Sequence, residues 1–316
     1  MKKVAVSVGD MNGIGIALAL EAHSRVSSLV QPLYLVDREM LRQAAKLLKR
    51  DIPKDFHILA PDAVPFAIRP GCVDAAAGAY SFASFKAAVD LCIEGHADAL
   101  CTLPIHKEAW SLAGIPYKGH TDALRDFFDA QAIMMLGCPE MYVGLYTEHI
   151  PLREVPDALD TQKLERFLLD FYREAAPTGP IGVLGLNPHA GDGGVLGQEE
   201  QKVRAAIDAA NRQILQDSNP RNPNPPFVGP LVPDTAFTPT MRERFIHYVA
   251  LYHDQGLIPL KALYFDESIN VSLNLPILRT SVDHGTAFDI AYTHTKPRDR
   301  SYLNAIRYIA QQPHRA

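Results

Sequence analysis

Several features that would assign this 316-residue chain to a particular class of protein are missing from its sequence. No apolar run reaches the roughly 18 residues that a transmembrane helix needs, so we expect no membrane span. The opening stretch, MKKVAVSVGD, lacks the apolar length and the small-residue cleavage site of a signal peptide, and it is typical of a first β-strand. The net charge is −5, so we expect no basic surface for nucleic acid.

Cysteine is scarce, with four residues and no CxxC pair among them. In a chain of this length without a signal peptide, we expect reduced thiols and a cytoplasmic protein. We interpret the four as ordinary packing residues: Cys72, Cys92, Cys101 and Cys138.

The sequence does contain a repeated alternation of apolar strands and amphipathic helices. This alternation predicts an α/β fold with mostly parallel strands. The expected strands cover residues 3–8, 32–37, 97–104, 133–137, 141–147, 181–188, 245–252 and 269–275. The expected helices cover residues 15–23, 38–50, 81–95, 161–175, 199–217, 286–292 and 300–312. Thr161 is the expected N-cap of its helix, and residues 218–230, rich in proline and asparagine, are expected to form an open loop.

Polar residues interrupt the apolar pattern just after several expected strands. Open α/β sheets bind ligands at the carboxyl ends of their strands, so these interruptions are candidate functional sites. They cover residues 6–15, 117–124, 145–154, 185–200, 251–263 and 274–291.

The first interruption, VSVGDMNGIG, partly resembles a dinucleotide-binding loop. Gly13 and Gly15 supply two glycines of that pattern, but the third position is Leu18. Asp37 follows the next strand, where a ribose-binding acid would lie. The alternative is a tight turn between strand and helix, of the kind that most α/β proteins contain.

Four histidines follow apolar segments beside small or turn-forming residues: His120, His149, His189 and His253. Strand ends converge in space, so the last three could form one cluster, and three imidazoles suit a catalytic divalent ion. Asp254 and Asp234 are then candidates to orient the ring nitrogens, although either could instead cap a helix or form a turn.

Cationic and polar residues form a second candidate set. Lys261 lies in an expected apolar strand, where an unpaired ammonium is costly, and Arg279 follows the apolar LPIL. With Asn270 and the pair His120–Thr121 at a helix N-terminus, they could bind a phosphate or carboxylate, and Thr121 would also cap its helix. Alternatively, Lys261 reaches out to an edge and Arg279 pairs with a local acid such as Asp283.

Five blocks, in this order and spacing, resemble the 4-hydroxythreonine-4-phosphate dehydrogenase (PdxA) family of vitamin B6 biosynthesis. They are GHTD, NPHAGDGG.LGQEE, GPLVPDTAF, YHDQGL.PLK and N.SLNLP..RTSVDHGTAFDIA. The resemblance implies a two-domain α/β/α fold like that of isocitrate and isopropylmalate dehydrogenases, which binds NAD(P) without a Rossmann glycine fingerprint. We expect one domain from residues 1–130 plus about 275–316, a second at about 131–274, and the active-site cleft between them.

The resemblance also implies roles for residues at the matching positions. The metal ligands would be His149, His189 and His253, supported by the carboxylates Asp234 and Asp254. The residues that bind the substrate would be His120, Thr121, Lys261, Asn270 and Arg279. Gly256 would form the turn after His253. A homodimer is expected, with the active site at its interface and residues from both subunits.

The first loop departs from the usual family pattern. Met11 and Asn12 stand where the family commonly has Pro-Ala, and Ile16 and Ala17 stand where it has Pro-Glu. The role of this loop and the preference for NAD or NADP therefore stay open. So do the residues that bind the cofactor, the general base, the native metal, and the subunit that supplies each ligand.

The implied reaction is the NAD(P)-dependent oxidation of 4-phosphohydroxy-L-threonine at C3, assisted by one divalent ion (Zn, Mg or Co) per subunit. Decarboxylation to 3-amino-2-oxopropyl phosphate would follow, on the route to pyridoxal 5'-phosphate. One alternative is a sister dehydrogenase acting on threonate or erythronate 4-phosphate. Another acts on aromatic cis-dihydrodiols, but it would not need the phosphate-binding set. A three-histidine hydrolase or aldolase would need no nicotinamide, and a non-catalytic binding protein would have no use for both sets.

Overall fold

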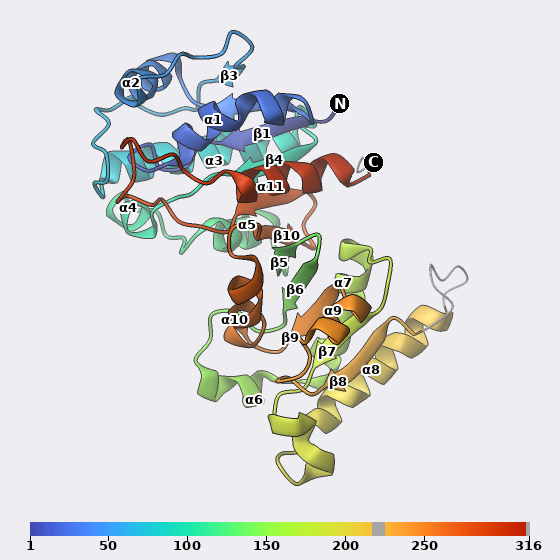
Figure 1. Cartoon of the computed structure of the whole chain (residues 1–316). Helices are drawn as coiled ribbons and strands as arrows, with labels where there is room; N and C mark the ends of the chain where they lie inside the picture. Colours follow the sequence, from blue (N-terminus) through green and yellow to red (C-terminus); the bar gives the residue numbers. More distant parts are fainter. Residues whose placement is uncertain (217–224, 314–316) are drawn as a thin grey trace. The chain divides into compact units, whose positions relative to one another are not determined.

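The computed structural model describes residues 1–216 and 225–313 and divides into two compact units (Figure 1). The first unit combines Met1–Ala130 with the described chain from Ile269 onward, and the second is Gln131–Ser268. The second unit is therefore an insertion in the first, after which the chain returns to the first unit.

The sheet of the first unit has the strand order β3-β2-β1-β4-β11-β10. Neighbouring strands are parallel from β3 to β11, and β10 runs antiparallel to β11. The buried, β-branched and apolar residues of β1 and β4 suit a sheet that is covered on both faces. The strands are β1 (Lys3–Ser7), β2 (Gln31–Leu35), β3 (Ile58–Leu59), β4 (Ala99–Thr102), β10 (Ile269–Leu273) and β11 (Arg279–Val282).

Helices cover both faces of this sheet (Figure 1). Helix α11 packs against α1 and β11, while α3 packs against β1, β4 and α4. Asp37 begins α2 by accepting hydrogen bonds from the backbone N–H groups of Glu39 and Met40, at 2.8 and 2.9 Å. The helices are α1 (Gly15–Ser27), α2 (Arg38–Leu48), α3 (Ala75–Ile93), α4 (Lys107–Leu112), α5 (His120–Phe128) and α11 (Arg300–Gln311).

The strands of the second unit lie in the order β5-β6-β9-β7-β8. Strands β5 and β6 are antiparallel, and the pairs β6–β9, β9–β7 and β7–β8 are parallel. The strands are β5 (Ile133–Cys138), β6 (Met141–Leu145), β7 (Ile181–Leu184), β8 (Phe227–Leu231) and β9 (His247–Ala250). The helices are η1 (Leu152–Glu154), α6 (Val155–Ala158), α7 (Thr161–Ala175), η2 (Pro188–Gly194), α8 (Glu199–Gln216), α9 (Pro239–Arg244) and α10 (His253–Tyr264).

The strand predicted around Lys261 is wrong, because His253–Tyr264 forms helix α10. Leu257 and Leu260 lie one turn apart and pack into the core of the second unit, which is helical rather than alternating burial. Gly256 is not a turn but a close packing point within this helix. A Cβ there would lie 2.5 Å from Val143 Cγ1, so only glycine lets α10 approach the sheet this closely.

Three smaller expectations also differ from the structure. Residues 286–292 form turns rather than a helix. The N-cap of α7 is Asp160, which accepts from Lys163 N at 2.9 Å, and Thr161 is the first helical residue. The expected open loop 218–230 lies outside the described residues as far as 224, and its end forms strand β8 from Phe227.

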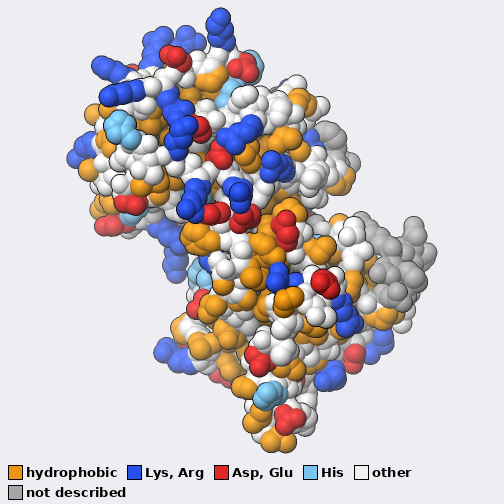
Figure 2. Space-filling view, viewed as in Figure 1, with side chains coloured by type: hydrophobic (Ala, Val, Ile, Leu, Met, Phe, Trp, Pro, Cys, Tyr) orange, Lys and Arg blue, Asp and Glu red, His pale blue; other side chains and the backbone are white. Residues whose placement is uncertain are grey.

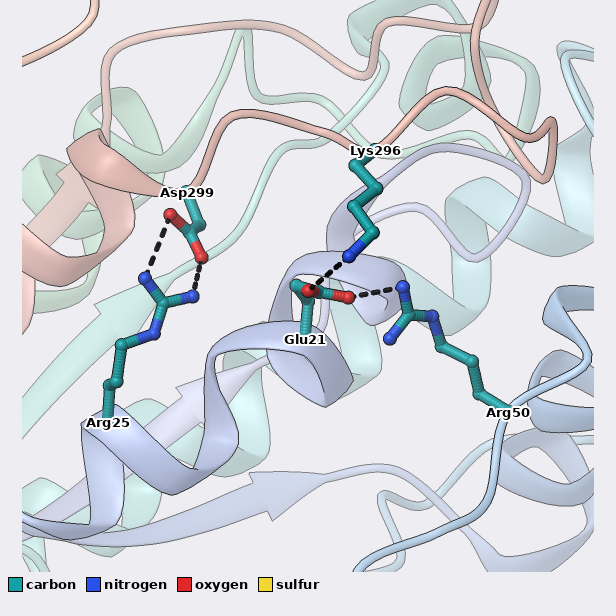
Figure 3. A network of polar contacts seen from close by, with 5 residues as sticks. All are labelled: Glu21, Arg25, Arg50, Lys296 and Asp299. Carbon is teal, nitrogen blue, oxygen red and sulfur yellow. Dashed lines mark hydrogen bonds and ion pairs between the residues drawn. The ribbon is translucent and has the colours of Figure 1, made fainter.

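Ion pairs fix the segment that precedes α11 to the first helix (Figure 3). Arg25 of α1 pairs with Asp299, and Glu21 of the same helix accepts from both Lys296, at 3.4 Å, and Arg50. These contacts hold a long segment without regular structure against the body of the first unit.

Figure 2 shows acidic and basic side chains mixed over the face in view, with apolar side chains between them. The presence of both signs of charge agrees with the small net charge of −5. Among the described residues, no helix is long and apolar enough to cross a membrane.

Candidate active site

A row of polar side chains crosses the strands of the first unit at the carboxyl ends of the parallel ones. Ser7 is in register with Thr102, Thr102 with Ser281, and Ser281 with Asn270, so the row spans β1, β4, β11 and β10. Ser7 and Thr102 are fully buried. Residues in one row of a sheet face the same side, so this row forms a polar patch inside an otherwise apolar layer.

Arg279, at the start of β11, extends its guanidinium into this polar region. The residue is 2% exposed. Its Nε and Nη2 donate to Thr102 Oγ1 at 3.2 and 2.7 Å, and its Nη1 donates to Ser272 Oγ at 3.1 Å. The alternative pairing with a local acid such as Asp283 is therefore wrong, because every hydrogen bond that this guanidinium donates in the described part of the chain goes to a hydroxyl. Burial without a carboxylate lowers the pKa of Arg279 to about 10, so it stays charged at neutral pH.

His120 is the first residue of α5 and lies against two aromatic rings. Its ring centroid is 4.7 Å from that of Phe85 and 5.4 Å from that of Trp110. Burial, and then the nearby charge of Arg279, holds the pKa of His120 well below its usual range, so the ring is neutral at pH 7. Its buried Nε2 has no hydrogen-bond partner within residues 1–216 and 225–313. A neutral imidazole with a spare nitrogen can bind a polar group of a ligand.

Two further residues of the predicted substrate-binding set also lie in the first unit. Asn270 on β10 has a buried Oδ1 without a hydrogen-bond partner among the described residues. Thr121 follows His120 on α5, but the expected cap is wrong. The N-cap is Gly119, which has no side chain and so makes no side-chain capping hydrogen bond. The Thr121 hydroxyl is thus not used as a cap. The fifth member of the set, Lys261, lies half-buried on α10 of the second unit.

Two of the three predicted metal-ligand histidines lie together in the second unit. The ring centroids of His149 and His253 are 5.3 Å apart. His253 begins α10, and its Nδ1 is 2.7 Å from Asp254 Oδ1, which leaves Nε2 for another ligand. A carboxylate on the second ring nitrogen is the usual support of a metal-bound histidine. The pair and its carboxylate therefore fit two positions of a divalent-metal site.

The third predicted ligand does not join this pair within one chain. Among the residues that the structure describes, no group of three or more His, Cys, Asp or Glu side chains could hold a metal ion. His189 lies exposed on η2, and Asp234 is exposed on the segment after β8. A complete three-histidine site therefore needs a ligand from outside the single chain, or a movement within it.

The loop that carries His189 has an uncommon backbone. Residues 189–193 all have positive φ, between 43° and 77°, and two of the five are glycine. Left-handed backbone costs about 1–2 kcal/mol for each residue with a Cβ, so surrounding contacts must hold it. The buried carboxylate of Glu200 accepts from the backbone N–H groups of Leu186 and Asn187 at 2.8 and 2.6 Å, and from Asn187 Nδ2 at 2.9 Å.

Sequence reasoning missed Glu200, Thr102 and Ser272. Glu200 follows Glu199 in GQEE at the start of a helix, where acidic residues are usually exposed. Only its 6% exposure in the structure shows that it is buried. The two hydroxyl residues sit inside ordinary strand sequences. Their value comes from neighbours on other strands, which sequence order does not reveal.

The first loop is not a dinucleotide fingerprint in this fold. Asp37 caps α2 and also accepts from Tyr80 Oη at 2.6 Å, so its carboxylate is already engaged. Asn12, at an atypical position, ties the loop to the chain before α3. Its Oδ1 accepts from Arg69 N at 2.8 Å, and its Nδ2 donates to Cys72 O at 2.9 Å. The Met11–Asn12 departure thus has a structural role, because an alanine could make neither side-chain bond.

Asp10 is the second unusual residue of this loop. Its carboxyl is fully buried, and Oδ1 accepts from Asn12 N at 2.9 Å. Its Oδ2 has no hydrogen-bond partner in the described part of the chain. Burial raises the pKa of Asp10 to about 6.

Comparison with known proteins places these residues in context. A 4-hydroxythreonine-4-phosphate dehydrogenase of Sulfurimonas denitrificans is 55% identical over 96% of each chain. A solved structure of a 4-hydroxythreonine-4-phosphate dehydrogenase from Klebsiella pneumoniae is 31% identical, with a TM-score of 0.82 over 98% of this chain and 100% of that one. A terephthalate 1,2-cis-dihydrodiol dehydrogenase from Burkholderia xenovorans is more distant, at 26% identity and a TM-score of 0.67 over 98% and 97% of the chains.

These likenesses confirm the mixed α/β fold that the sequence predicts. The model of the family described as pyridoxal phosphate biosynthetic protein PdxA matches residues 28–309. That match spans both units and every residue of the two predicted sets. The chain belongs to the PdxA family of pyridoxal phosphate biosynthetic proteins.

Proposed function

We propose that this protein is a 4-hydroxythreonine-4-phosphate dehydrogenase. It would oxidise 4-phosphohydroxy-L-threonine at C3 with NAD or NADP and release carbon dioxide to give 3-amino-2-oxopropyl phosphate, for pyridoxal phosphate synthesis. The observation that carries the proposal is Arg279, a buried cation held only by hydroxyl groups, in a member of this family. A buried charge without a counter-ion is costly, and a substrate phosphate would supply the missing negative charge.

The phosphate would be bound mainly from the first unit. Arg279 supplies the charge and geometry of a guanidinium, which suits a phosphate. Neutral His120 offers Nε2, and Asn270 offers its side-chain amide. Thr121 would add a hydroxyl from the first turn of α5, and Lys261 of α10 would add a second cation. Together these residues fix where the substrate carbon chain lies, which sets the distance for hydride transfer.

His149 and His253 would hold a divalent ion, with Asp254 orienting the ring of His253. Such an ion, when bound, lowers the pKa of a coordinated hydroxyl and stabilises the negative charge that develops on it. Asp234 is proposed as a further support of the site. His253 and His149 would thus place the C3 hydroxyl, while the phosphate-binding residues hold the other end of the substrate.

His189 would complete the ligand set from the second subunit of a homodimer. The exchange of His189 between subunits is supported by two observations. His149 and His253 lie together in one chain, and no third His, Cys, Asp or Glu side chain joins them in a possible metal site among the described residues. Large apolar side chains on and after α10 are exposed, among them Ile258 at 67% and Phe265 at 61%. Exposed apolar side chains on and just after the helix that His253 begins are consistent with an interface along it.

The reaction follows from these positions. The C3–H bond breaks as a hydride leaves for the nicotinamide, and the hydroxyl proton is lost, so C3 becomes a ketone. The product is a β-keto acid, and loss of its carboxylate as carbon dioxide leaves an enolate that is then protonated. We propose that the reaction takes place in the cytoplasm.

The test is NADH or NADPH formation from 4-phosphohydroxy-L-threonine, before and after stripping with a chelator and adding back Zn²⁺, Mg²⁺ or Co²⁺. We expect activity to be lost on stripping and restored by metal. Turnover that survives complete stripping would remove the metal from the proposal. Threonate 4-phosphate and erythronate 4-phosphate serve as the comparison substrates, and faster turnover of either would assign the protein to a sister activity.

A further inference from the structure

The side chain of Arg279 is held from both sides by residues of the neighbouring strands. Thr102 lies on β4 and Ser272 on β10, and β11 runs between these strands. Ser272 is the register partner of Arg279 itself. Both hydroxyl residues are fully buried, so water does not replace them as hydrogen-bond partners of the guanidinium.

Counting the donors of Arg279 shows what remains for a ligand. A guanidinium has five N–H groups in one plane. Thr102 Oγ1 accepts from Nε and Nη2, and Ser272 Oγ accepts from Nη1. One N–H on each Nη is therefore left, and two N–H groups on neighbouring nitrogens can bind two oxygens of one phosphate.

We propose that Thr102 and Ser272 are positioning residues that hold Arg279 for bidentate binding of the substrate phosphate. This inference rests on the proposed function of Arg279 and adds two residues to the phosphate-binding machinery. Hydroxyls suit the task better than carboxylates would. They fix the plane of the guanidinium but leave its charge uncompensated, so the charge is available to the phosphate.

The hydroxyls also reduce the cost of binding. A free arginine side chain has large rotamer freedom, which is lost when it grips a ligand. Here the two cross-strand contacts restrict the side chain before any ligand arrives, so less freedom is lost on binding. The effect should therefore fall on affinity for the phosphate group and much less on the chemical step.

The central variant is Thr102→Val, which removes the acceptor but keeps the shape. We expect the KM for the phosphorylated substrate and the Ki of inorganic phosphate to rise by at least about tenfold, because the lost bonds involve a charged group. The value of kcat should stay within about twofold, as expected when an interaction is equal in ground and transition states. Thr102→Ser keeps the hydroxyl and should restore most of the affinity. Ser272→Ala should also weaken phosphate binding, because it removes the single hydrogen bond from Arg279 Nη1 to Ser272 Oγ.

Thr280→Val is the matched control. Thr280 is next to Arg279, is equally buried, and donates to Ala305 O on α11 at 3.3 Å rather than contacting the guanidinium. The same substitution there should leave KM, Ki and kcat unchanged. If Thr102→Val fails to fold by circular dichroism, Ser272→Ala carries the test alone.

The outcomes separate this inference from the proposed function. If Arg279→Met weakens phosphate binding but Thr102→Val and Ser272→Ala do not, the positioning role of the two hydroxyls is wrong. The phosphate-binding role of Arg279 then stands. If Arg279→Met leaves KM and Ki unchanged, the phosphate role itself is wrong. An equal loss in Thr280→Val would show that Thr102→Val acts only by disturbing the sheet, and this would also overturn the inference.

Discussion

Replacing the buried carboxyl of Asp10 by an amide should make the protein more stable at neutral pH and change how its stability depends on pH. Asp10 is fully buried, and its Oδ2 has no partner in the described part of the chain. Burial raises its pKa from the ordinary value of 3.8 to about 6. The folded protein therefore binds this proton more tightly than the unfolded chain does, and the free energy of unfolding falls as pH rises through that window.

The magnitude follows from the two pKa values. A pKa difference of about two units lowers the free energy of unfolding by roughly 3 kcal/mol at pH values above the folded-state pKa. Below pH 3.8 the free energy of unfolding is almost unaffected. Asn at this position keeps the acceptor for Asn12 N but adds a buried N–H, at a pH-independent cost of about 1 kcal/mol. Asp10→Asn should thus gain roughly 2 kcal/mol over wild type at pH 8, and its advantage should shrink by about that amount at pH 4.5.

The assay is urea unfolding of both proteins at pH 4.5, 6 and 8, followed by far-ultraviolet circular dichroism. Asp62→Asn, the same change at an exposed carboxylate, is the control. A difference between Asp10→Asn and wild type that is the same at all three pH values would refute the reasoning. That result would mean that Asp10 is not a carboxylate held in a desolvated site.

Three further predictions concern the loops and the subunits. Equal mixing of His189→Ala and His253→Ala chains, after dissociation and reassociation, should restore about a quarter of wild-type activity. Random pairing makes half of the molecules mixed dimers with one intact site of two, and no recovery would place all ligands in one subunit. Glu200→Gln should weaken zinc binding about tenfold or more in a direct titration, since it disturbs the bonds that hold the His189 loop, whereas an unchanged affinity would show that the loop holds itself. Asn12→Ala should lower the free energy of unfolding by about 1–3 kcal/mol through two lost hydrogen bonds, and a urea midpoint equal to that of wild type would contradict this.

Part of the fold could be predicted because each strand and helix carries its own pattern. The alternation of apolar strands and amphipathic helices predicts most elements within a few residues. It fails at α10, where a short apolar run with Pro259 and Gly256 fits a strand or a helix equally well. Tertiary packing decides that case, since Leu257 and Leu260 contact the core of the second unit.

The sequence singles out a candidate site residue where that residue stands in an unusual local context. Arg279 after an apolar run and His253 before a turn-like segment are such cases. Thr102 and Ser272 were not predictable, because hydroxyl residues are common in strands. The partner of Thr102, Arg279, is also 177 residues away in the sequence. Asp37 shows the opposite error. Its place after a strand suggested ribose binding, but it caps a helix.

The most direct test of the account compares kcat/KM for 4-phosphohydroxy-L-threonine between wild type and Arg279→Met. Removing a buried charge that binds a phosphate should lower kcat/KM by about 100-fold or more, and 4-hydroxy-L-threonine without its phosphate should be turned over equally slowly by both proteins. A kcat/KM that is unchanged in a folded Arg279→Met protein would contradict the central claim that this buried arginine binds the substrate phosphate.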